Sequence, residues 1–168
     1  VSVQDQAYLA PARRLQHSWP VGGVRYGFSR ELAETMHLFR KFEATCATYH
    51  EIRRRGIRVV IGGDHGFSIT PMGQNARDIG HFVKYFGYAP AEALRCATKI
   101  GAELMGHGGE LGVIREGALA DLLLVDGNPL ADQTVLVGPD RFRMVMKDGN
   151  LYRDPRQSGG RRQQAAAE

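Results

Sequence analysis

The chain has 168 residues, which is close to the usual size of one domain and long enough to bury a hydrophobic core. Hydrophobic residues make up 43% and charged residues 24%, a balance that excludes disordered and fibrous proteins. The formal net charge is +4, and no apolar run approaches the roughly 18 to 20 residues that span a bilayer, so we expect no membrane segment.

Prolines and glycines interrupt residues 1–28, which predict a loop with one short helix near residues 7–16. This stretch has no basic start followed by an apolar run, so no signal peptide is predicted. Cys46 and Cys96 fall in helical patterns far apart in the sequence. That placement favours buried, reduced thiols in a cytoplasmic protein over a disulfide.

Residues 29–55 predict one long helix. Ser29 suits the N-cap, apolar residues recur at spacings of three and four, and Gly56 suits the position that ends the helix. The arginines at 53–55 close this helix, where positive charge complements the helix dipole. They have no interleaved aromatic residues, so we expect no nucleic-acid partner.

The segment that follows predicts a short strand ending at an aspartate. Residues 57–61 are apolar except for Arg58 and are rich in β-branched side chains, as in a strand of a parallel sheet. Gly62 and Gly63 permit a tight turn, and Asp64 then lies at the carboxyl end of the strand, where α/β proteins bind ligands. The alternative is that Asp64 only closes a turn or caps the next segment.

The rest of the chain divides into a helical part and a β part. We predict a loop up to Pro71, a helix over about residues 74–86, and a second helix from Pro90 to about residue 105. Beyond Gly106 we predict short strands in residues 111–117, 120–129 and 141–152. The last of these is a β-hairpin with Asp148–Gly149 at its bend.

Two phrases carry a family resemblance: A-P-A-E-A-L-R-C-A-T at residues 89–98 and G-A-L-A-D-L-L-L-V-D-G-N-P-L at residues 117–130. With the strand and G-G-D-H-G before them, they resemble the C-terminal portion of the metal-dependent amidohydrolase superfamily, close to imidazolonepropionase-like enzymes, over residues 56–152. The resemblance implies an α/β fold. Residues 1–105 would form the last units of a (β/α)8 TIM barrel, with its final strand at 57–62. Residues 106–153 would form strands of a small β-sandwich. Separately from the resemblance, residues 154–168 have no apolar period and predict a disordered tail.

The resemblance also implies a chemistry, the hydrolysis of carbon–nitrogen bonds other than peptide bonds in a small-molecule substrate. Asp64 would bind a divalent metal, most often zinc, and take a proton from the water that the metal activates. His65, Phe67 and Ser68 are candidate substrate-binding residues in the loop after the strand. His65 lines the pocket only if the glycines bend the chain, because neighbours on a strand point to opposite faces.

The sequence departs from the family in its histidines. The family carries a His-x-His pair on its first strand, and this chain contains none; its six histidines are scattered at positions 17, 37, 50, 65, 81 and 107. Because zinc sites use three or four protein ligands, we expect the chain to carry only part of an active site. The rest would come from an N-terminal barrel portion or from a homo-oligomer. The competing interpretation is a non-catalytic remnant that self-associates through faces meant for missing neighbours.

Overall fold

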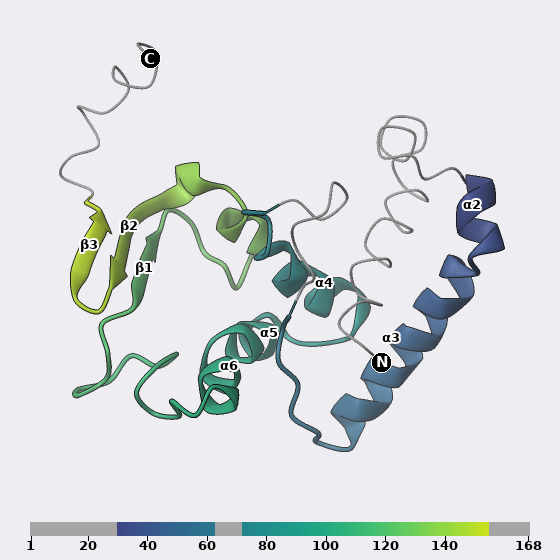
Figure 1. The fold of residues 1–168 in the computed structure, drawn as a ribbon, viewed down its shortest axis with the longest axis horizontal. Helices are drawn as coiled ribbons and strands as arrows, with labels where there is room; N and C mark the ends of the chain where they lie inside the picture. The colour runs from purple at the N-terminus through teal and green to yellow at the C-terminus, as the bar shows by residue number, and fades with distance from the viewer. Residues whose placement is uncertain (1–29, 63–71, 155–168) are drawn as a thin grey trace, which may run out of the picture.

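The computed structural model describes residues 30–62 and 72–154 (Figure 1). Its helices are α2 (Arg30–Thr35), α3 (Leu38–Arg54), α4 (Arg77–Tyr85), α5 (Pro90–Ala97) and α6 (Lys99–Leu104). Its strands are β1 (Leu122–Val125), β2 (Phe142–Lys147) and β3 (Asn150–Arg153), with the 3-10 helices η2 (Gln133–Leu136) and η3 (Pro139–Arg141) between β1 and β2. The predicted helix near residues 7–16, the predicted site residues and most of the predicted tail lie outside the described residues.

The long helix predicted for residues 29–55 is two helices. His37 has φ 55 and ψ 32, in the left-handed region, and separates α2 from α3. Leu38, directly after the break, is only 2% exposed, so the interruption between α2 and α3 accompanies the burial of this side chain. At the other end Gly56 has φ +66 and ends α3 as predicted, since glycine adopts this conformation without steric cost.

Aromatic side chains from α3, α4 and the connection between α4 and α5 form the centre of the hydrophobic core. Tyr49 of α3 stacks on Phe86 with ring centroids 4.1 Å apart, and Phe82 of α4, 0% exposed, meets Tyr49, Phe86 and Tyr88 edge-on or tilted. Ala93 and Cys96 of α5 complete the buried cluster. The helical part is therefore held together by one aromatic core to which three successive helices contribute.

The second predicted helix also divides in two. Pro90 occupies the first turn of α5, as predicted, but Thr98 with φ −117 and ψ −87 separates α5 from α6. A Cβ on Gly112 would lie 2.5 Å from the carbonyl carbon and oxygen of Thr98, so the backbone of residue 112 packs directly on the break. The break at Thr98 thus coincides with a contact between segments distant in the sequence. No glycine or proline at Thr98 predicts it from the sequence alone.

The C-terminal part contains an antiparallel sheet of three strands in the order β1-β2-β3. The predicted hairpin is confirmed: β2 and β3 are joined by Asp148 and Gly149, with φ 48 and 73, as an Asp-Gly turn between strands requires. The strand predicted at residues 111–117 is not formed. Positive φ at Gly106, Gly109, Gly112 and Gly117 makes this region a series of turns, with one isolated bridge between Gly108 and Leu111.

Residues 57–62, predicted to be the final barrel strand, are assigned to no strand. Val59 and Ile61, two residues apart, both pack against the helical core, which is the side-chain alternation of an extended chain. A parallel strand also needs backbone hydrogen bonds to neighbouring strands, and the described residues supply none to this segment. The described part is thus an α/β arrangement with one small sheet, without a closed barrel or a second sandwich sheet.

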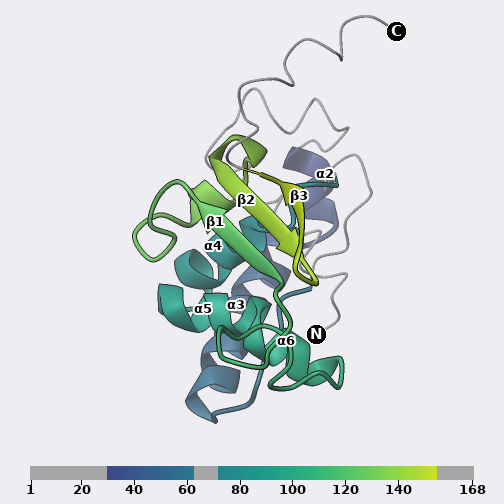
Figure 2. The ribbon, with the colours of Figure 1, turned by 90° about the vertical axis from the view of Figure 1, so that its left-hand side faces the viewer.

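The sheet lies beside the helical part rather than beneath it (Figures 1 and 2). η2 connects the two, because it contacts α4, its Leu136 packs against the helical core and its Val135 is buried. No helix in the described part of the chain is long and apolar enough to cross a bilayer.

Candidate functional site

All four predicted site residues, Asp64, His65, Phe67 and Ser68, fall within residues 63–71 and so lie outside the described residues. What the structure does describe is the chain on either side of them. Residues 57–62 lead into this segment, and residues 72–76 followed by α4 lead out of it. The candidate site is therefore built from these two supports.

The incoming support is fixed to the helical core at several points. Val59 and Ile61 pack on the aromatic cluster, and the backbone N–H of Ile57 donates to the carbonyl of Ile52, 3.1 Å away, at the end of α3. Arg58 points to the opposite side, where its guanidinium donates to Glu103 of α6 at 2.8 Å. Alternate side chains thus bind the segment to the core and to α6.

The outgoing support begins with a turn and continues as α4. The N–H groups of Arg77 and Asp78 donate to the carbonyls of Gln74 and Asn75, which tightens the chain before the first full helical turn. Ile79 and Phe82 then bury the inner face of α4 in the same core that receives Val59 and Ile61. Because both supports share one core, the two ends of residues 63–71 are held in a defined relation to each other.

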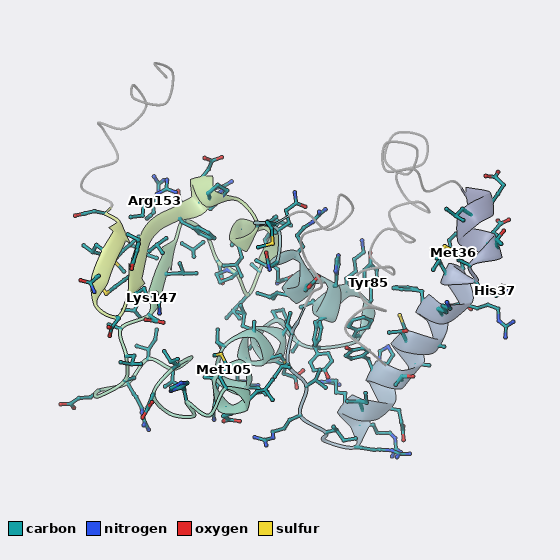
Figure 3. The ribbon with its side chains drawn as sticks, in the orientation of Figure 1. Met36, His37, Tyr85, Met105, Lys147 and Arg153 are labelled. Carbon is teal, nitrogen blue, oxygen red and sulfur yellow. The ribbon has the colours of Figure 1, made fainter. Side chains whose placement is uncertain are left out.

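An ionisable pair lies at the start of α4, with its carboxylate in the first turn of the helix. Asp78 Oδ1 is 3.2 Å from Nδ1 of His81, with side chains that are 15% and 31% exposed. The His81 ring packs against the Tyr85 ring in a tilted arrangement, with ring centroids 5.8 Å apart. Tyr85 in turn contacts Phe42 of α3 edge-on, with centroids 5.3 Å apart. Figure 3 labels Tyr85 where α4 faces α3. His81 is assigned no partner in the sequence analysis, although its spacing of three residues from Asp78 on a helix signals such a pair.

The other described histidines do not join this pair. His37 and His50 are exposed on the α2–α3 segment, and His107 is exposed in the glycine-rich turns, with its Nδ1 3.1 Å from Glu110. His17, like His65, lies outside the described residues. Cys46 and Cys96 are free thiols, and burial raises the pKa of the Cys96 thiol, which favours its unreactive protonated form.

Within residues 30–62 and 72–154, no three His, Cys, Asp or Glu side chains are grouped as a metal ion would require. The described residues therefore do not fit a zinc ion by themselves.

Comparison with known proteins decides the family. The sequence profile of the amidohydrolase family matches residues 40–152, more than half of the chain and the whole of both supports. The chain belongs to the amidohydrolase family. This confirms the resemblance seen in the sequence, and the match reaches further toward the N-terminus than the region that carried the resemblance.

Named members of the amidohydrolase family are similar to this chain. Ochratoxinase from Aspergillus niger is 31% identical over 108 residues, which cover 64% of this chain and 22% of that enzyme. Imidazolonepropionase from Thermoplasma volcanium is 30% identical over 102 residues, which cover 59% of this chain and 24% of that enzyme. A prolidase solved in complex with N-methylphosphonate-L-proline superposes with a TM-score of 0.65 at 28% identity, covering 88% of this chain and 33% of that one. The chain thus spans about a quarter of the length of the curated relatives it matches.

Proposed function

We propose that this chain is the C-terminal portion of a hydrolase that cleaves carbon–nitrogen bonds in a small-molecule substrate. The observation that carries the proposal is the family match over residues 40–152, which includes Asp64 and both segments that support it. The solved relatives belong to a family of TIM-barrel proteins, so the complete fold proposed is a barrel to which residues 30–105 contribute final units. The free thiols of Cys46 and Cys96 support a cytoplasmic location within the same proposal.

The carbon–nitrogen bonds in this proposal include peptide bonds as well as other amide bonds. Ochratoxinase and imidazolonepropionase are named for ochratoxin and imidazolonepropionate, whereas other similar structures are a prolidase and a Xaa-Pro dipeptidase. These names include peptide and non-peptide substrates. The substrate panel for this chain should therefore contain ochratoxin, imidazolonepropionate and Xaa-Pro dipeptides.

Asp64 is the residue we propose as metal ligand, with zinc as the metal, because the family is generally metal-dependent. When bound, the metal supplies a water whose pKa is lowered to about 7. The carboxylate of Asp64 would hold the ion and accept a proton, while His65, Phe67 and Ser68 would contact the substrate. The described supports are consistent with this role, since they bring the chain into and out of residues 63–71 from one packed core.

Metal content tests the assignment of Asp64. Where a homo-oligomer or an N-terminal barrel portion completes the site, we expect elemental analysis to find zinc bound stoichiometrically, and Asp64→Asn to lose it, because an amide is a far weaker zinc ligand than a carboxylate. Asp140→Asn is the matched control, since Asp140 lies in η3, outside the two segments that flank residues 63–71, and should leave zinc content unchanged. Equal zinc in all three proteins would remove Asp64 from the site, and no zinc in any of them would show that this chain does not hold a metal centre.

A second candidate function is a non-catalytic module that associates with itself. The observation favouring it is the number of large apolar side chains left in contact with solvent, among them Ile57 at 54%, Leu104 at 72% and Ile114 at 91% exposed. Exposed large apolar side chains are available for association between copies of the chain, because contact with another molecule would remove them from water. A self-associating chain without zinc and without hydrolysis of the substrate panel would favour this candidate over the enzyme.

A further inference from the structure

We draw no further inference here: the strongest candidate, the apolar face that Leu124, Met144 and Leu151 form on the three-stranded sheet, carries no proposal because nothing in the structure shows what covers it.

Discussion

Tyr88 illustrates how a single hydroxyl in the helical core couples stability to pH. Its side chain is 8% exposed, and its hydroxyl finds no hydrogen-bond partner among the described residues. Burial, with smaller contributions from the neighbouring Cys96 and Tyr49, raises the pKa of Tyr88 to about 12. The folded state therefore resists ionisation of this phenol, which the unfolded chain permits near pH 10.

The pH dependence follows from that difference. Below about pH 10 the phenol is neutral in both states, and between about pH 10 and 12 only the unfolded chain ionises, so the free energy of unfolding falls by up to roughly 1.4 kcal/mol per pH unit. We expect Tyr88→Phe to lack this part of the alkaline loss. At pH 7 it should be as stable as wild type or slightly more stable, because it removes a buried polar atom without a partner. Urea unfolding of both proteins at pH 7 and pH 11 measures this. Parallel losses in the two proteins would contradict the assignment to Tyr88.

Three glycines differ in how strongly their positions should resist substitution by alanine. Gly138 has an ordinary φ of −107 and Gly56 a φ of +66, and a Cβ at either would meet no atom within 4 Å. Gly112 combines φ +70 with backbone atoms of Thr98 at 2.5 Å. We expect alanine to be nearly neutral at Gly138, to cost about 1 kcal/mol at Gly56 through backbone strain alone, and to cost more at Gly112.

Thermal and urea unfolding of the three alanine variants would rank them. The matched pair of Gly138 and Gly56 separates backbone strain from steric clash, since neither position crowds a neighbour. A similar cost at both would show that the left-handed conformation at Gly56 is not required, and a mild cost at Gly112 would show that the contact with Thr98 relaxes easily.

At the level of elements, α4 connects the candidate site to the core. Phe82 is completely buried at the centre of the aromatic cluster, while Lys84, two residues further along α4, is exposed with its amine 5.4 Å from the centre of the Tyr85 ring. We expect Phe82→Ala to cost about 3 to 5 kcal/mol of unfolding free energy through lost burial and the cavity left behind. Lys84→Ala should cost below about 1 kcal/mol, and chemical denaturation of both variants would test the contrast.

The consequence for the site can be measured in the same variants. Because Phe82 shares its core with Val59 and Ile61, its loss should loosen both supports of residues 63–71. If wild-type chain binds zinc, Phe82→Ala should bind it more weakly than Lys84→Ala does. Equal zinc affinity in the two variants, with Phe82→Ala still folded by circular dichroism, would show that the site does not depend on this core.

At the scale of the whole molecule, the exposed apolar side chains predict association. We expect sedimentation velocity to show concentration-dependent self-association of the chain. Ile114→Ser should weaken it without lowering the melting temperature, since this side chain is 91% exposed and contributes little to packing. Glu116→Ser, two residues away and also exposed, is the control that should leave association unchanged. A monomer at every concentration would contradict the self-associating module.

Local sequence signals predicted the elements that depend on local chemistry. Gly56 ends α3, Pro90 begins α5, and Asp148–Gly149 turns the hairpin of β2 and β3, because each residue type restricts or frees the backbone at its own position. The family was also within reach of the sequence, since the phrases at residues 89–98 and 117–130 lie inside the region that the family profile matches.

Tertiary contacts decided what local periodicity could not. Each of two predicted helices is divided into two in the structure. One break is at His37, next to the buried Leu38, and the other is at Thr98, against which the backbone of Gly112 packs. Burial and close backbone packing override helix propensity at these single positions. Residues 57–62 keep the alternating side chains of a strand without its ladder, since strand formation depends on neighbours and not on the segment alone. The identity of Asp64 as the candidate ligand came from sequence. The attachment of its flanking segments to one aromatic core was visible only once α3, α4 and α5 were packed together.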